Sequence, residues 1–133
     1  MKTQNWMLFA LLGLTLLLGA CSEHNCSLDT ESDKKTFGDL APATSGANSC
    51  FVSNGELVAT HPDKSVDEVA TSYKKALEAK KYEVKMEAHQ GERGNGESYE
   101  GKRLLLKKGD KEAGVVIYPL TEGIIETVTM VRK

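Results

Sequence analysis

The sequence predicts an α+β fold, a two-layer sandwich in which one helix packs on a mainly antiparallel sheet, with the element order β-α-β-β-β. Apolar residues recur at helical spacing from Val66 to Leu77, which indicates an amphipathic helix. Apolar and polar residues alternate strictly over residues 82–89, which is typical of a half-buried strand. Short β-branched runs separated by glycine turns follow this strand. One apolar helix face and one apolar sheet face then cover each other.

The first predicted strand and the helix each follow a local signal. Leu57–Thr60 comes directly after the turn dipeptide Asn54-Gly55 and is expected to be a short strand. Ser65 has Glu68 three positions later, which is the capping-box pattern of a helix N-terminus. The helix is therefore expected to begin at Ser65.

The remaining strands are expected in the C-terminal half, where the last three form a meander. The polar stretch Gln90–Gly101 contains four glycines and is expected to be a loop. Gly109-Asp110 marks a tight hairpin turn, and Pro119 ends the strand before it. The segments expected to be strands are residues 82–89, 102–108, 113–118 and 124–132.

Length and composition limit the class of protein. The chain has 133 residues and a formal net charge of −2, which fits one small domain and lacks the basic excess of a nucleic-acid-binding protein. A hydrophobic fraction of 40% with 27% charged residues excludes collagen-like and wholly disordered chains. We therefore expect one folded domain and no nucleic-acid partner.

The N-terminus has the pattern of a secretory signal peptide. Lys2 precedes a largely apolar run of 13 residues, Trp6–Leu18, which is shorter than the roughly 20 residues that a membrane-spanning helix needs. The following tetrapeptide, Leu18-Gly19-Ala20-Cys21, resembles the lipobox of bacterial lipoproteins. This resemblance implies that residues 1–20 are removed and that Cys21 carries acyl chains such as palmitate, which hold the protein on the lipid bilayer. In such lipoproteins an aspartate after the lipidated cysteine tends to retain the protein at the inner membrane. Because this position is Ser22, the resemblance favours the outer membrane, facing the periplasm.

A tether is expected between the lipidated cysteine and the domain. Residues 21–49 are mostly small or polar, a composition that favours a flexible spacer, so the domain is expected over residues 50–133. Cys26 and Cys50 bracket this tether. In the oxidising compartment of exported proteins a disulfide between them is the leading interpretation, with two free thiols or an intermolecular bridge as alternatives.

No set of residues in the sequence forms a recognisable catalytic or metal site. The three histidines, His24, His61 and His89, are too far apart to share a helix face and are expected to be surface residues. Gly96–Lys102 matches the spacing of a phosphate-binding loop but lacks the following Ser or Thr. We therefore expect no enzyme activity, no cofactor and no metal. A third hypothesis, a hydrolase of cell-wall polymers, would require paired carboxylates in a cleft.

The domain resembles small uncharacterised envelope lipoproteins that have a helix, a long strand and a glycine-turn hairpin. This resemblance favours a non-enzymatic interaction or accessory module in the cell envelope, which binds an envelope protein by adding a strand to a sheet edge. The discriminating feature is an exposed edge strand without proline or inward-facing charges. The alternative is a periplasmic ligand-binding or inhibitor-type lipoprotein that uses the Gln90–Gly101 loop.

Overall fold

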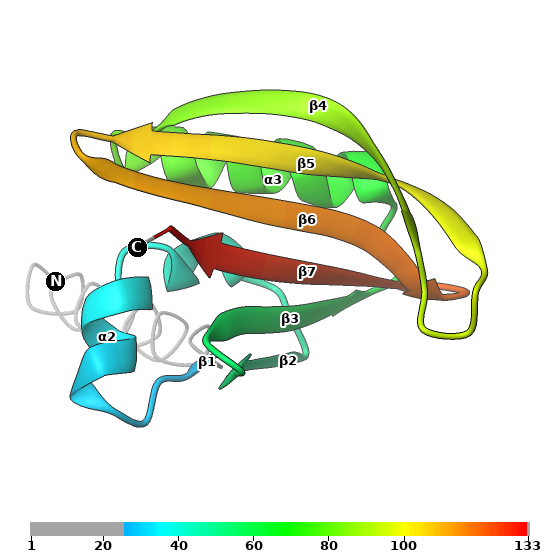
Figure 1. Ribbon diagram of the computed structural model, residues 1–133, viewed down its shortest axis with the longest axis horizontal. Coiled ribbons are helices and arrows are strands. Elements are labelled where there is room, and N and C mark those ends of the chain that lie inside the picture. The colour runs from blue at the N-terminus through cyan, green and yellow to red at the C-terminus, as the bar shows by residue number, and fades with distance from the viewer. Residues whose placement is uncertain (1–25, 133) are drawn as a thin grey trace, which may run out of the picture.

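The computed structural model describes residues 26–132 and has the predicted α+β architecture, with two helices packed on a seven-strand, mostly antiparallel sheet (Figure 1). The strand order across the sheet is β1-β2-β3-β7-β6-β5-β4. The elements along the chain are β1 (Cys26–Ser27), α2 (Glu31–Phe37), the 3-10 helix η1 (Ala41–Thr44), β2 (Ser49–Ser53), β3 (Glu56–Pro62), α3 (Val66–Ala79), β4 (Glu83–Glu92), β5 (Ser98–Lys108), β6 (Lys111–Thr121) and β7 (Ile124–Val131).

The connection through α3 places β4 at one edge of the sheet. Every neighbouring pair of strands is antiparallel except β1 and β2, which are parallel. β3 and β4 consequently run in the same direction, and α3 crosses one face of the sheet to join them. The strands β4 to β7 then return across the sheet as a meander until β7 pairs with β3. The two outermost strands are therefore the two-residue β1 and the ten-residue β4.

The predicted order β-α-β-β-β contains too few strands, because it counts only three after the helix although four segments are expected there. Four strands follow α3, and β1, β2 and β3 precede it. Asn54-Gly55 is the turn of a hairpin between β2 and β3, where both residues have positive φ (52° and 78°), the conformation that tight hairpin turns require. The dipeptide therefore has a strand on each side, and no strand was expected at β2, most of which lies beside or within the segment interpreted as a tether.

The helix α3 has the predicted capping box. The Ser65 hydroxyl accepts a hydrogen bond from the Glu68 backbone N–H (3.1 Å), and a Glu68 carboxylate oxygen accepts one from the Ser65 N–H (3.2 Å). The buried face of the helix consists of Val69, Ala70, Tyr73 and Leu77. Its periodicity in the sequence therefore matches the face that packs on the sheet.

Residues 26–49 are not the flexible tether that their composition predicts. Thr30 caps α2, and Phe37 and Leu40 are each only 2% exposed within the same core as α3. The Asp39 carboxylate accepts hydrogen bonds from the Tyr82 hydroxyl (2.7 Å) and from Lys111 Nζ (3.0 Å). These contacts, together with the buried Ala43 and Ala47, make residues 26–49 part of the folded unit, which therefore does not begin at residue 50.

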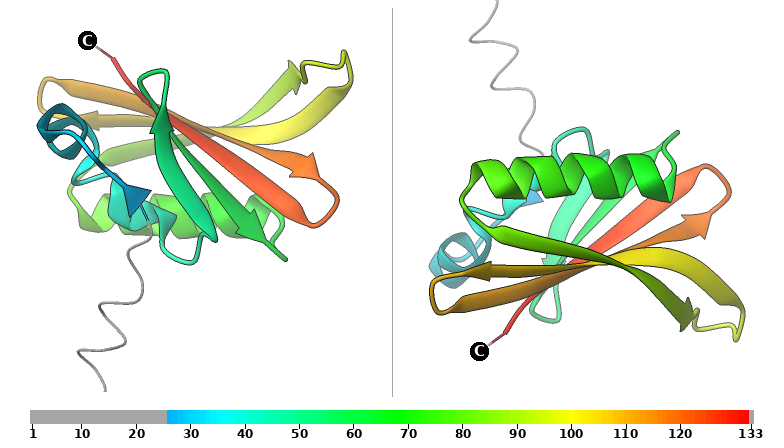
Figure 2. Two further views of the ribbon diagram at one scale, coloured as in Figure 1. Left: turned by 90° about the horizontal axis from the view of Figure 1, so that it is seen from below. Right: turned by 90° about the horizontal axis from the view of Figure 1, so that it is seen from above.

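Among the described residues, helices cover one face of the sheet but not the other. The described helices lie on one side of the sheet (Figure 2), over inward-facing residues such as Leu57, Leu104 and Ile117. We call the opposite side the open face, defined by the side chains of Phe51, Val58, Leu105, Val116, Tyr118, Val128 and Met130. Three of these large apolar residues, Phe51, Leu105 and Met130, are 38–44% exposed.

Candidate functional site

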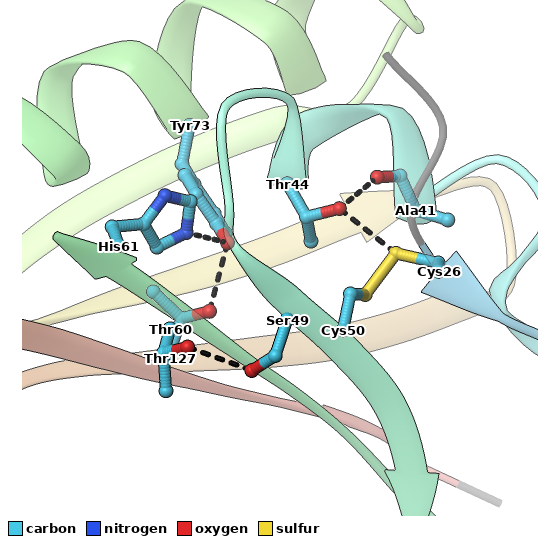
Figure 3. The surroundings of a disulfide bond; sticks show 9 residues. All are labelled: Cys26, Ala41, Thr44, Ser49, Cys50, Thr60, His61, Tyr73 and Thr127. Atoms are coloured by element: carbon cyan, nitrogen blue, oxygen red, sulfur yellow. Dashed lines mark hydrogen bonds between the residues drawn. A yellow bond between two sulfur atoms is a disulfide. The ribbon is translucent and has the colours of Figure 1, made fainter. Parts of the chain in front are cut away.

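The structure contains the predicted disulfide between Cys26 and Cys50. These residues face each other across the parallel β1–β2 pair, with their Cα atoms 4.4 Å apart (Figure 3). The Thr44 hydroxyl lies 2.9 Å from Cys26 Sγ and donates a hydrogen bond to the Ala41 carbonyl (2.6 Å). The disulfide thus fastens the start of the folded unit to β2 and to η1.

The lipobox and Cys21 lie outside the described residues, so the lipidation of Cys21 stays a prediction. His24 also lies outside them. None of the helices in residues 26–132 is long and apolar enough to cross a membrane. In the same residues, no three His, Cys, Asp or Glu side chains gather in a way that could hold a metal ion.

His61 is not the surface residue expected from the sequence, because it is 4% exposed. Its Nε2 lies 2.8 Å from the Tyr73 hydroxyl, which in turn lies 2.8 Å from the Thr127 hydroxyl (Figure 3). Burial, and then the charge of Lys64, lower the pKa of His61. Burial likewise raises the pKa of Tyr73. The three side chains form a neutral hydrogen-bonded network that joins β3, α3 and β7 inside the core.

A groove of about 680 Å³ lies between α3 and the turn after η1, with His61 and Tyr73 in its lining. Its outer walls carry both cations and carboxylates, with Lys64 and Lys75 opposed by Asp67 and Glu68. The balanced charge selects neither an anion nor a cation. The hydrogen bonds among His61, Tyr73 and Thr127 satisfy polar groups of the core beneath this groove. We therefore assign a structural role to this network.

The predicted Gln90–Gly101 loop is much shorter than expected. β4 continues to Glu92 and β5 begins at Ser98, so only residues 93–97 form the turn. Gly91 and Gly101 are strand residues at close approaches: a Cβ at Gly91 would collide with the Tyr99 ring, and one at Gly101 with the Ile117 carbonyl. Glycines that indicate a loop by composition are therefore needed here for packing between strands.

The β4–β5 hairpin leaves the sheet at Gly101 and curves over the open face. β5 pairs with β6 only from Lys102 onward, and the hairpin end diverges from the β6–β7 turn (Figure 2). Arg93 reaches back from the turn, donating hydrogen bonds to the Pro119 carbonyl and to Glu97 (3.1 Å). Arg93 Nε is buried and has no hydrogen-bond partner among the described residues.

Aromatic side chains line the groove of about 400 Å³ that this curvature creates on the open face. Tyr99 from β5 stacks on Tyr118 from β6, with ring centroids 4.8 Å apart, and His89 lies against Tyr99 at 5.9 Å. Burial, followed by the hydrogen bond and negative charge of Glu126, raises the pKa of Tyr118. The groove therefore offers apolar and hydrogen-bonding groups, and Arg93, Glu56 and Glu92 are the charged residues in its lining.

The outer edge of β4 is a second candidate binding surface. β4 is the last strand in the sheet order, and among the described residues nothing pairs with its outer side. It contains no proline. Val84 and Met86 on its α3-facing side pack against the core, whereas Glu83, Lys85 and Glu87 are on the open face. The strand thus has the features expected of an edge that can accept a further strand.

Sequence reasoning found β4 through its alternation but missed both grooves. The alternation over residues 82–89 already separates the charged from the apolar side of β4. The open-face groove depends on where the β4–β5 hairpin separates from β6, which the sequence does not show. In the structure Gly91 faces Tyr99 and Gly101 faces His89 across the β4–β5 pair. No protein-family model, no curated protein and no solved structure matches this chain.

Proposed function

We propose that this chain is a bacterial lipoprotein that acts as a non-enzymatic interaction or accessory module in the cell envelope. Acyl chains on Cys21 hold it on the lipid bilayer, at the outer membrane and facing the periplasm. Two features support this proposal: the lipobox after a short apolar segment, and a disulfide that begins the folded unit, as exported proteins in an oxidising compartment commonly have. Only residues 22–25 separate Cys21 from Cys26, so the domain sits close to the bilayer.

The observation that carries the proposed function is the unpaired edge of β4. A strand with free N–H and C=O groups binds an extended segment through main-chain hydrogen bonds, and the alternating side chains select the partner. Sheets normally protect such edges with proline, bulges or inward-pointing charges. The inward positions Val84, Met86 and Ala88 carry no charge, and β4 and β5 pair without a register shift. Charged side chains also discourage strand pairing, and those of Glu83, Lys85 and Glu87 leave this edge open only to a strand of complementary charge.

Photo-crosslinking in intact cells tests this proposal. A photoreactive amino acid replaces Lys85 on the β4 edge, and a matched variant carries it at Glu78, an exposed residue of α3. We expect a discrete crosslinked product from the Lys85 position and none from Glu78. Equal crosslinking at both positions, or no product at Lys85, would overturn the assignment of β4 as the binding edge.

The open-face groove favours a second candidate function, a periplasmic ligand-binding or inhibitor-type lipoprotein. The observation behind it is the buried Nε of Arg93, which has no hydrogen-bond partner among the described residues. Arg93 lines the same groove as the stacked Tyr99 and Tyr118. Soluble peptidoglycan fragments are the probe for calorimetric titration. Binding that is lost in Gly94→Pro and Glu97→Ala, with unchanged circular dichroism, would support this function. Binding that is equal in the parent chain and both variants, or absent from all three, would remove it.

A further inference from the structure

The edge of β4 is complementary to itself. Two antiparallel copies of one edge strand can meet about a two-fold axis perpendicular to the sheet, which keeps the helices of both copies on the same side. Residues that face each other then point to the same side of the joined sheet, so even positions face even positions and odd face odd. A shift of one residue would place the charged side of one copy against the apolar side of the other.

One register brings opposite charges together. When Met86 faces Met86 of the second copy, Lys85 faces Glu87 and Glu83 faces His89, and each of these contacts occurs twice by symmetry. On the α3-facing side, Val84 then faces Ala88. Opposite charges directly across a strand pair are favourable, as are apolar pairs. Residues 83–89 therefore match on both sides of the strand at once.

The neighbouring registers are unfavourable. A shift of two positions in one direction places Lys85 opposite Lys85 and Glu83 opposite Glu87. A shift in the other direction places Glu87 opposite Glu87. Like charges that face each other directly are destabilising. The charges of Glu83, Lys85 and Glu87 therefore disfavour pairing in the neighbouring registers and favour the register centred on Met86.

The structure holds one of the required charges in place before any partner arrives. Glu87 accepts a hydrogen bond from Arg103 Nε at 2.7 Å, and a second from the same guanidinium group. Glu87 is half-buried, whereas Lys85 is exposed and has no ion pair among the described residues. Lys85 is therefore free to reach a carboxylate that Arg103 already orients.

The apolar side of β4 is also prepared for a continued sheet. Val84 and Met86 are only partly buried against the core of their own copy. Seen from above, β4 lies in front of the rest of the sheet with α3 alongside it, so no described element crosses its outer edge (Figure 2). A second β4 would extend the sheet and complete the burial of both side chains.

From these observations we infer that the partner at the β4 edge is a second copy of this chain, which pairs antiparallel in the register centred on Met86. This inference rests on the proposed function, in which β4 is the binding edge. The interface is isologous, because the same residues contribute from both copies. It produces a closed dimer with one continuous sheet.

Charge exchange at positions 85 and 87 tests the inference. The acylated chain, extracted in detergent, is examined by sedimentation velocity over a range of concentrations. Lys85→Glu alone places a second carboxylate opposite Glu87, and Glu87→Lys alone places a second ammonium group opposite Lys85. Each variant should raise the dimer Kd by about tenfold or more. A mixture of the two variants should restore association as a heterodimer, because both pairs between positions 85 and 87 are then oppositely charged.

Cysteine crosslinking tests the register separately. Met86→Cys places one thiol opposite its own copy, within the roughly 4.4–6.8 Å Cα separation that a disulfide requires. We expect a covalent dimer after mild oxidation. The matched variants Val84→Cys and Ala88→Cys should form no covalent dimer alone and should crosslink when mixed. Equal crosslinking of all three single variants would overturn the register.

The outcomes separate this inference from the proposed function. A chain that stays monomeric at all concentrations, while the photoreactive group at Lys85 captures a different envelope protein, would overturn self-pairing and leave β4 as the binding edge. Absence of any product at Lys85 would overturn both. Restored association in the mixture of charge variants supports both.

Discussion

Truncation of Phe37 tests whether the N-terminal segment belongs to the core. The Phe37 side chain is 2% exposed and packs in the same cluster as α3 and the sheet. Replacing a buried phenylalanine by alanine removes its transfer free energy and leaves a cavity, which together cost about 3–5 kcal/mol. Small domains have a total unfolding free energy of about 5–15 kcal/mol. Phe37→Ala should therefore remove a large part of the stability of the domain.

Urea unfolding followed by circular dichroism measures this change. Fluorescence of tryptophan is of no use, because the only tryptophan of the chain, Trp6, lies in the predicted signal peptide. Lys35→Ala in the same helix is the matched control, since Lys35 is exposed and should cost less than about 0.5 kcal/mol. If both variants lose less than about 0.5 kcal/mol, residues 26–49 behave as a tether and the reasoning is refuted.

Three further predictions concern the disulfide, one carboxylate and the anchor. Replacing Cys26 and Cys50 by serine should lower the unfolding free energy by up to about 3.5 kcal/mol, from the 24-residue separation that the bond closes; unchanged urea midpoints would contradict this. Although partial burial acts to raise it, the Tyr82 hydrogen bond and the two nearby lysines hold the pKa of Asp39 below 3.8. Its stabilisation is present above about pH 4 and is lost as the pH falls through the lowered value. Asp39→Asn should therefore flatten the acid limb of the stability profile, and an unaltered limb would refute the contribution. Cys21→Ser should move the protein from the membrane to the soluble fraction, and continued retention on membranes would count against lipidation.

Local patterns predicted those elements whose signal lies within one stretch of chain. The stripe from Val66 to Leu77, the cap at Ser65 and the alternation of β4 are local, and each element lies where its pattern indicates. The capping-box hydrogen bonds were predictable because they join residues three positions apart. The α+β class followed from these elements alone.

The rest depends on contacts between distant residues. Phe37 and Leu40 are isolated apolar residues in a polar stretch, and their burial becomes apparent only when α3 and the sheet are in place. His61 is buried because Tyr73 and Thr127, which are 54 positions apart, complete a hydrogen-bonded network with its ring nitrogen. No local composition distinguishes such a histidine from a surface one.

The candidate binding surfaces were predictable in part. The sequence identified the charged and apolar sides of β4, but its position at the edge follows from the crossover through α3, which is a property of strand order. The groove beneath the β4–β5 hairpin was not predicted, because Gly91 and Gly101 indicated a loop. Their place in strands is explained by the close approach of the Tyr99 ring to Gly91 and of the Ile117 carbonyl to Gly101.

Amide hydrogen exchange tests most directly the claim that the β4 edge is occupied. The exchange of a peptide covering residues 83–92 is compared between protein in isolated membranes and extracted protein diluted until it is monomeric. The account predicts strong protection of this peptide in membranes and its loss on dilution, while core peptides such as residues 102–108 stay protected in both. Equal exchange of the β4 peptide under both conditions would contradict the account.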